Sequence, residues 1–275
     1  MQVPLELLET LPLWGVIPYP AAITLLDTQN AGLIPKEPKS IIVAAFPYLL
    51  PEERYGKNRN ISRYACVPDY HKVVSARLRE VCEKLRAAYP TAQMARFCDN
   101  SPFPEVALAV EAGLGVRGRH GLLITKAYGS WVFIGEIVTD IPFEPMRLTP
   151  QPHPCTDCFG HCRSRCPGEA LDSGKLRRDL CLSMILQRRI PLPAKAADMV
   201  KQSGCIWGCD TCQEVCPANW DVRINPLPEF AEDIQPILTE QTMDLPNRAY
   251  TWRGHSILVR NLGLWKPDEE RYPTK

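Results

Sequence analysis

Two short runs of cysteine residues constrain this 275-residue chain more than any other feature. Nine of its 12 cysteines lie between Cys155 and Cys216. The first run is Cys155-x2-Cys158-x3-Cys162-x3-Cys166-Pro167, and the second is Cys205-x3-Cys209-x2-Cys212-x3-Cys216-Pro217. Soft thiolate ligands closely spaced along the chain suit iron–sulfur clusters better than hard cations. We therefore expect this segment to fold around metal clusters.

Two loops that each end in Cys-Pro are typical of a ferredoxin-like domain with two [4Fe–4S] clusters, where the cysteine before each proline ligates the other cluster. One predicted cluster is held by Cys155, Cys158, Cys162 and Cys216. The other is held by Cys166, Cys209, Cys212 and a fourth cysteine. A four-cysteine zinc site, which normally uses two cysteine pairs, and unligated structural or redox thiols are the alternatives.

The fourth ligand of the second cluster has two candidates, Cys181 and Cys205. Spacing alone slightly favours Cys205, because it completes a run of four that matches the first run. The residues leave this choice open.

The composition is that of a globular protein, with 45% hydrophobic and 23% charged residues. No apolar run reaches the roughly 18 residues of a membrane span, and the opening MQVPLELLETLPLWG lacks a basic signal-peptide region. We therefore expect a cytoplasmic protein with no membrane partner, whose thiols stay reduced. A net charge of +1 argues against a general attraction to nucleic acid. A local basic edge is predicted at Arg177, Arg178, Arg188 and Arg189.

The first half of the chain alternates strand and helix patterns. Strands are predicted at 40–48, 92–99, 121–125 and 130–140, and helices at 69–89 and from Ser101-Pro102 to Gly113. The pattern indicates an α/β or α+β layer at 1–147. The Pro-rich stretch 141–154 reads as a linker, the cysteine segment 148–222 contains a helix at about 175–189, and 223–275 is a C-terminal extension.

Several stretches resemble the epoxyqueuosine reductase family. They are RYACVPDYHKVVSARL (63–78), CDNSPFPEVALAVEAGLG (98–115), YGSWVFIGEIVTDIPFEP (128–145) and both cysteine runs, with GCDTCQEVCPAN (208–219) especially similar. The resemblance covers the chain from about Ser40 to Trp220. It implies an oxidoreductase of queuosine biosynthesis, which reduces the epoxide of a modified tRNA nucleoside to an alkene.

The resemblance also implies the cofactors and their partners. It implies an α/β nitroreductase-like domain that binds cobalamin, beside a ferredoxin-like module with two [4Fe–4S] clusters. An electron donor such as ferredoxin or flavodoxin would reduce the clusters, the clusters would reduce cobalamin, and tRNA would be the substrate partner.

Site residues follow from the same resemblance. Asp99 falls on the family's proton-donating Asp, and Cys181 in Cys181-Leu-Ser183 falls on a cluster ligand, which leaves Cys205 as a buried spare. The positions implied to line cobalamin are Asp99, Leu123, Ile134, Val138, Ser183 and Asp210.

The sequence also departs from the family pattern. Val116, Arg119 and His120 replace a Trp and a Lys-Asn pair, Val106 replaces an Arg, and one extra residue separates Cys158 from Cys162. The chain ends soon after HSILVRNLG, where the family's C-terminal helical repeat domain begins, so we expect a short paralogue. Two alternatives follow: an iron–sulfur electron-transfer or cofactor-handling protein, and a cobalamin-dependent reductase of another substrate.

Several local features have plain structural readings. Asp99 is a proton donor by the resemblance, but Asp-Asn-Ser-Pro alone favours a turn or capping residue. Gly113-Leu-Gly115-Val-Arg-Gly118 follows a helix instead of a strand, so it predicts a helix-ending turn rather than a dinucleotide site. Arg117, Arg119 and His120 are either a phosphate contact or a solvated turn, and His71 either contacts a ligand or packs.

Overall fold

The computed structural model describes residues 1–25, 31–148, 152–172 and 175–265. The described chain divides into two compact units. The first comprises 1–47, 70–118 and 122–153, and the second comprises 48–69, 119–121 and 154–275. This division differs from the sequence-based boundaries, because 48–69 and 119–121 join the cysteine-bearing unit and 223–265 is part of that unit. Residues 149–151 of the expected linker and the charged tail 266–275 lie outside the described residues.

The first unit is built on a four-stranded antiparallel sheet in the order β1-β2-β6-β3. Its strands are β1 (Leu13–Pro18), β2 (Ser40–Pro47), β3 (Met94–Phe97) and β6 (Val132–Thr139), with a small ribbon of β4 (Val116–Arg117) and β5 (Leu123–Ile124). Its helices are α1 (Leu5–Leu8), α2 (Tyr19–Ala22), α4 (Tyr70–Ala88) and α5 (Glu105–Glu111), with 3-10 turns η1 (Ile23–Leu25) and η2 (Ala31–Leu33). The predicted mixture of helices and strands is confirmed, with every ladder of the main sheet antiparallel.

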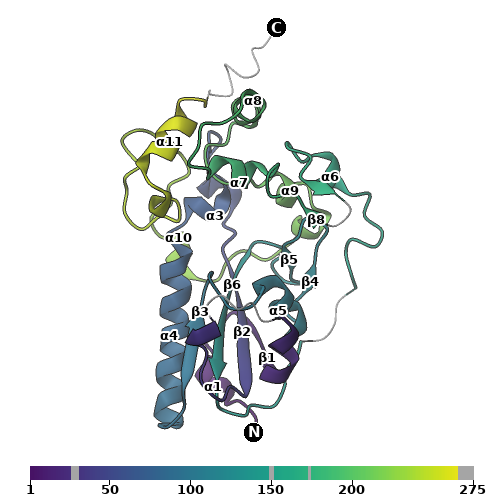
Figure 1. Cartoon of the computed structure of the whole chain (residues 1–275), viewed down its shortest axis with the longest axis vertical. Helices are drawn as coiled ribbons and strands as arrows, with labels where there is room; N and C mark the ends of the chain where they lie inside the picture. The colour runs from purple at the N-terminus through teal and green to yellow at the C-terminus, as the bar shows by residue number, and fades with distance from the viewer. Residues whose placement is uncertain (26–30, 149–151, 173–174, 266–275) are drawn as a thin grey trace. The chain divides into compact units, whose positions relative to one another are not determined.

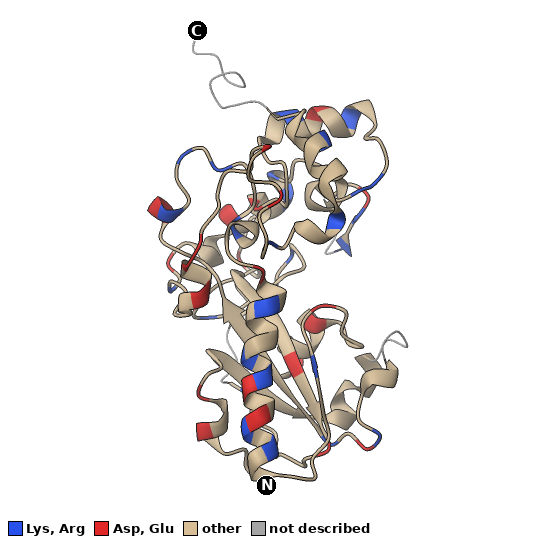
Figure 2. Ribbon diagram, turned by 90° about the vertical axis from the view of Figure 1, so that its left-hand side faces the viewer, with Lys and Arg blue, Asp and Glu red and all other residues tan. Residues whose placement is uncertain are grey.

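The long helix α4 packs along β6 and β3 (Figure 1). Its buried side chains recur at helical spacing: Val74, Leu78, Val81, Cys82 and Leu85. Gly135 of β6 lies beneath this helix, where an added Cβ would come within 2.8 Å of Val74. The solvent side of α4 carries alternating basic and acidic residues (Figure 2). The predicted amphipathic helix is therefore confirmed within one residue at each end.

The helix α5 contacts β2 and β6 on the hydrophobic core of the first unit. Leu108 and Ala109 of α5 belong to the same buried cluster as Val43, Phe97 and Val138 of the sheet. The helix begins at Glu105, not at Ser101-Pro102 as predicted. Ser101 Oγ accepts a hydrogen bond from the Phe103 amide over 3.0 Å, and Pro104 keeps Phe103 out of the helical conformation.

The second unit consists of short elements joined by turns. Its helices are α3 (Arg63–Cys66), α6 (His161–Ser164), α7 (Leu182–Leu186), α8 (Ala194–Ser203), α9 (Thr211–Glu214), α10 (Pro228–Ala231) and α11 (His255–Leu262). The remaining elements are the hairpin β7 (Leu171–Asp172) and β8 (Lys175–Leu176), with 3-10 turns η3 (Glu52–Arg54), η4 (Pro217–Asn219) and η5 (Thr251–Arg253). Loops that bind a metal cluster, as the sequence predicts for this unit, need little regular structure, because the metal ties them together.

The helix predicted at about 175–189 is wrong in extent. Residues 175–176 form β8, and only Leu182–Leu186 are helical. The Arg177 amide donates to the Ala170 carbonyl over 2.8 Å, which commits this part of the chain to the hairpin. Pro191 and Pro193 then precede α8, and Pro193 is its N-cap residue.

Candidate functional site

Four thiols of the second unit act on one another electrostatically. Burial raises the pKa of Cys162, and the thiols of Cys155 and Cys158 raise it further. Burial also raises the pKa of Cys216. The thiols of Cys155, Cys162 and Cys158 raise the pKa of Cys216 further. Charges influence one another to this degree only at short range. These four cysteines are therefore neighbours, although 53 residues separate Cys162 from the next of them, at Cys216 (216 − 163).

A second group contains the other run and Cys181. Burial raises the pKa of Cys212, with further contributions in the same direction from Cys209, Cys181 and Cys166. Burial raises the pKa of Cys209 to about 11, and Cys181 contributes to that increase. The structure thus brings together Cys166, Cys181, Cys209 and Cys212.

Backbone amides are directed at several of these sulfur atoms. The Arg119 amide lies 3.4 Å from Cys155 Sγ, the Gly160 amide 3.4 Å from Cys158 Sγ, and the Ala170 amide 3.3 Å from Cys166 Sγ. Gly160 adopts a left-handed conformation at φ 81, which turns the chain within the longer Cys158-x3-Cys162 loop. Amide–sulfur hydrogen bonds stabilise thiolates and tune the potential of an iron–sulfur cluster. The kind of donor suits clusters held by thiolates, although within the described part of the chain no three or more His, Cys, Asp or Glu side chains are arranged to hold a metal ion.

Cys205 has different partners. Its Sγ donates to the Trp207 carbonyl over 3.1 Å and to the Gly208 carbonyl over 3.3 Å. Burial raises its pKa, so this sulfur stays a protonated thiol in the absence of a metal. A thiol that donates to two carbonyls serves as a structural contact of its loop.

Asp210, one of the predicted cobalamin contacts, is enclosed by two arginines. Its Oδ2 accepts from Arg59 Nη1 over 2.9 Å and from the Arg63 amide over 2.6 Å. Arg59 also pairs with Glu214 over 2.8 Å, and Arg63 with Glu52 over 2.7 Å. Burial raises the pKa of Asp210, and Arg59 opposes that increase. The sequence analysis missed both arginines, because no spacing pattern links 59–63 to 210.

Asp99 comes two residues after the end of β3 in the first unit. Its side chain contacts the first two residues of α4, Tyr70 and His71. Its Oδ2 accepts a hydrogen bond from the Tyr70 hydroxyl and lies 3.0 Å from His71 Nε2. Tyr70 is itself fixed by stacking on Phe133, with ring centroids 4.2 Å apart and planes 6° apart. Asp99 therefore belongs to a polar cluster and is not a helix cap. His71 contacts this cluster.

Two further carboxyl groups act on this cluster. The Asp99 amide donates to Glu105 Oε1 over 2.8 Å. Burial raises the pKa of Glu105 to about 7, and the neighbouring Asp99 raises it further. Glu136 is fully buried, and burial raises its pKa well above the usual value. Sequence analysis missed both residues, although GEIV in a strand placed an acid at a core position.

The apolar residues predicted to line cobalamin fall mostly in the core. Val138 is 0% exposed and Leu123 is 2% exposed, within the same hydrophobic cluster. Their roles toward cobalamin stay predictions. Ile134 is partly buried against that cluster. Ser183, in the other unit, is half-buried.

The basic turn expected at Arg117, Arg119 and His120 is not one surface. His120 is buried, and burial lowers its pKa to about 4, so it is neutral. Arg119 Nη1 donates to the Cys158 carbonyl over 2.7 Å and thus supports the first cysteine loop. Gly113 adopts φ 76 directly after α5, as predicted for a helix-ending turn.

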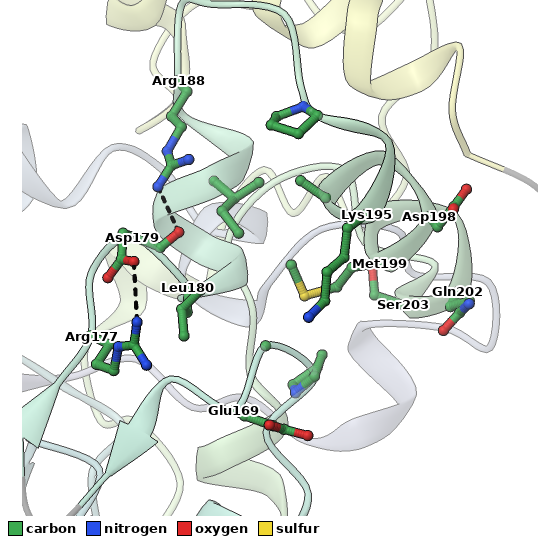
Figure 3. Close-up of a pocket in the computed structure, with 15 residues that line it drawn as sticks. Glu169, Arg177, Asp179, Leu180, Arg188, Lys195, Asp198, Met199, Gln202 and Ser203 are labelled. Carbon is green, nitrogen blue, oxygen red and sulfur yellow. Dashed lines mark hydrogen bonds and ion pairs between the residues drawn. The ribbon is translucent and has the colours of Figure 1, made fainter.

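A pocket of about 1030 Å³ lies beside Cys166 and Cys181 in the chain, between Pro167 and Ser203 (Figure 3). Arg177, Arg188 and Lys195 line it, with Asp179 between the two arginines. Arg177 pairs with Asp179 over 3.7 Å, and Arg188 donates to the Asp179 carbonyl over 2.6 Å. The segment 175–201 contains seven Lys and Arg and two Asp, whereas the whole chain has a net charge of +1. The pocket therefore belongs to a locally basic surface.

The sequence is similar to that of known proteins. The family model "Epoxyqueuosine reductase QueG, DUF1730" matches residues 29–100. An epoxyqueuosine reductase of Listeria monocytogenes is 35% identical over 83% of this chain and 64% of its own length. One of Gloeobacter violaceus is 38% identical over 81% of this chain and 72% of its own length. The chain thus spans less than two thirds of the Listeria relative.

Solved structures share the fold. The structure of epoxyqueuosine reductase from Streptococcus thermophilus aligns with a TM-score of 0.78, at 24% identity, over 96% of this chain and 80% of that one. An epoxyqueuosine reductase with a tRNA-Tyr epoxyqueuosine-modified stem loop aligns with a TM-score of 0.77 at 23% identity. The alignment covers 94% of this chain and 79% of that one. The catabolic reductive dehalogenase NpRdhA aligns with a TM-score of 0.53 at 16% identity. That alignment covers 93% of this chain and 36% of the dehalogenase.

The chain shares its fold with epoxyqueuosine reductases and with a reductive dehalogenase. The chain belongs to the epoxyqueuosine reductase family. Among the described residues, no helix is long and apolar enough to cross a membrane.

Proposed function

We propose that this protein reduces epoxyqueuosine in tRNA to queuosine, with cobalamin and two [4Fe–4S] clusters as cofactors. The observation that carries the proposal is the combination of two separate groups of four thiols with the Asp99 cluster in a member of this family. The relative with a modified tRNA stem loop supports tRNA as the substrate class. A reaction on tRNA is consistent with the cytoplasm as the compartment.

The first proposed cluster is bound by Cys155, Cys158, Cys162 and Cys216. The second is bound by Cys166, Cys181, Cys209 and Cys212. Mutual electrostatic action within each group supports the crossed arrangement, in which each Cys-Pro cysteine serves the other cluster. The carbonyl contacts of Cys205 support its exclusion from the second set.

Cobalamin, when bound, would supply the reductive chemistry at the epoxide carbon, with electrons from the clusters. The proposed cobalamin contacts are Asp99, Leu123, Ile134, Val138, Ser183 and Asp210, of which Ile134 and Ser183 offer accessible surface. Asp210 is proposed to act through Arg59 and Arg63, since its own side chain is only 2% exposed.

Asp99 is the proposed proton donor for the oxygen that leaves the epoxide. Its Oδ2 is held by Tyr70 and lies beside His71, and the side chain keeps 42% of its surface exposed. A general acid must reach the substrate and carry a proton at neutral pH. Exposure provides access to the substrate, and the Tyr70 hydroxyl and His71 Nε2 fix the position of the carboxyl group.

The basic segment 175–201 is the proposed docking surface for an acidic one-electron donor such as ferredoxin or flavodoxin. It flanks Cys181, which lies in the second thiol group, and its cations border the pocket of Figure 3. Complementary charge accelerates association and makes the rate sensitive to salt. Lys195→Glu should therefore slow cluster reduction by an acidic donor at low ionic strength, whereas Lys84→Glu on α4 should not.

Anaerobic titration of the cluster-loaded protein with cobalamin tests the proposal. The visible spectrum should change with a single binding stoichiometry at micromolar cobalamin. Ile134→Lys should abolish that change while retaining the iron, because it places a charge on the proposed contact surface. Wild-type protein that contains both clusters but binds no cobalamin would instead be an electron-transfer or cofactor-handling protein. Cobalamin binding without conversion of the tRNA nucleoside would indicate a different reducible substrate.

A further inference from the structure

A buried carboxyl group lies under the helix that carries Glu105. Glu136 of β6 is paired with Val43 of β2 and Phe97 of β3, whose side chains belong to the core beneath α5. It is 0% exposed, no ion pair reaches it among the described residues, and the Ser101 side chain is the one polar group that opposes the rise of its pKa by hydrogen bonding. An ionised carboxylate in such a place would cost several kcal/mol, so Glu136 is a neutral acid.

Glu105 links this buried acid to Asp99. Its Oε1 accepts the Asp99 amide over 2.8 Å. Asp99 and Asn100 both adopt left-handed conformations, at φ 56 and φ 49. Non-glycine residues in this region are strained and persist only where their surroundings hold them. Glu105 binds the backbone amide of Asp99 in this turn, while Tyr70 and His71 contact the Asp99 side chain.

The charged neighbours of Glu105 act in opposite directions. Burial raises its pKa to about 7, and Asp99 adds to that increase, whereas the Asp99 amide and His71 oppose it. For Glu136, burial is the largest cause, and Glu105 and Asp99 both add to it. Three carboxyl groups this close cannot all be ionised near neutral pH. Glu136 keeps its proton, and Glu105 binds a proton with a pKa of about 7.

The chemistry of the proposed reaction gives this arrangement a use. Conversion of an epoxide to an alkene breaks two C–O bonds and releases the oxygen as water. The balance requires two electrons, which the clusters of the proposed function supply, and two protons. Asp99 carries one proton at a time, so it must be reloaded within each turnover.

We propose that Glu105, supported by the neutral acid Glu136, is a positioning residue for Asp99 that fixes its turn and holds a proton in reserve. This inference rests on the proposed function. Asp99 gives its proton to the leaving oxygen and becomes a carboxylate. The Glu105 carboxyl proton then passes to Asp99 for the second transfer, and solvent restores the proton of Glu105 after water has left.

Infrared spectroscopy of the carboxyl C=O bands tests whether Glu105 carries the reserve proton, and it needs neither cofactor nor substrate. Wild-type protein should show a protonated-carboxyl band that disappears near pH 7 and another that persists at pH 9. Glu105→Gln should lose the first band, and Glu136→Gln should lose the second. The matched control is Glu111→Gln, on the same helix but paired with Arg147 at the surface, and it should lose neither. A first band that survives Glu105→Gln would overturn the proposal.

The pH profile of tRNA conversion separates this role from a purely structural one. Glutamine keeps a side-chain oxygen that can accept the Asp99 amide, so the turn should remain intact. Glu105→Gln should reduce the rate about tenfold at pH 5.5, where wild-type Glu105 carries the reserve proton, and should come within about threefold of wild type at pH 8, where wild-type Glu105 has ionised. An equal loss at both pH values would contradict the proton reserve. If wild-type protein converts no tRNA, the proposed function fails, and the infrared result still decides the protonation of Glu105.

Discussion

Asp99 donates its backbone amide to Glu105 Oε1 over 2.8 Å, and the two carboxyl groups act on each other electrostatically. One residue thus controls both the conformation and the charge environment of the proposed proton donor. The same contact explains why α5 begins at Glu105, three residues after Pro102, since Asp99 and Asn100 occupy a left-handed turn before it.

The Asp99 cluster should make stability fall as pH rises. The pKa of Glu105 is raised from 4.5 to about 7, so the folded protein binds more protons than the unfolded chain between these values. Stability linked to this group is fully present below about pH 4.5 and is lost as pH rises through about 7. The loss should approach about 3 kcal/mol.

Chemical denaturation at pH 5 and pH 8 measures this dependence. Glu105→Gln should be less destabilised than wild type by the change from pH 5 to pH 8, because its side chain does not titrate. Glu111→Gln should follow wild type. Parallel pH dependence in wild type and Glu105→Gln would show that the carboxyl group ionises normally.

The crossed ligand sets predict a specific metal content. Two [4Fe–4S] clusters correspond to about eight iron and eight sulfide per chain after anaerobic reconstitution. Elemental analysis and sulfide determination measure both quantities. Stoichiometric zinc, or only four iron, would contradict the two-cluster assignment.

Cys181 and Cys205 should respond differently to the same substitution. Cys181→Ser removes a proposed ligand of the second cluster, so about half of the iron should be lost. Cys205→Ser should keep nearly all of it, because a hydroxyl can still donate to the Trp207 and Gly208 carbonyls. Iron content of the two purified variants decides the matter. The reverse pattern would identify Cys205 as the ligand.

The enclosed charge of Asp210 makes Arg59 important for stability. Arg59→Ala leaves the buried carboxylate with only Arg63 as a cationic neighbour. Removal of one partner from a buried ion pair typically costs about 3 kcal/mol or more. The control Arg79→Ala breaks an exposed pair with Glu83 and should cost less than about 0.5 kcal/mol. Equal midpoints of unfolding for both variants would show that Asp210 is compensated by other groups.

The periodic pattern of apolar residues predicted those strands and helices whose formation depends on residues close together in the sequence. The strand at Ser40–Pro47 and the helix at Tyr70–Ala88 were predictable because burial repeats along each segment. The helix at about 175–189 was overestimated, because the Arg177–Ala170 hairpin contact competes with the helical pattern of the chain.

Contacts across the chain were beyond sequence reasoning. Glu136 lies 37 residues after Asp99 (136 − 99), and Arg59 lies 151 residues before Asp210, so no spacing rule connects them. The burial of Val138 was not predictable, because an apolar strand residue can face either a core or a ligand, and only the register against Ile41 and Ala95 places it in the core. The cysteines were predictable because their ligand chemistry restricts their spacing.

Nucleoside analysis of epoxyqueuosine-containing tRNA is the most direct test of the proposed function. Protein loaded with clusters and cobalamin, together with a one-electron donor, should convert epoxyqueuosine to queuosine in multiple turnovers. Asp99→Asn should retain cobalamin and about eight iron but lose conversion by at least about 100-fold, the usual contribution of a general acid. Wild-type protein that carries both cofactors and leaves epoxyqueuosine unchanged, or an Asp99→Asn variant as active as wild type, would contradict the account.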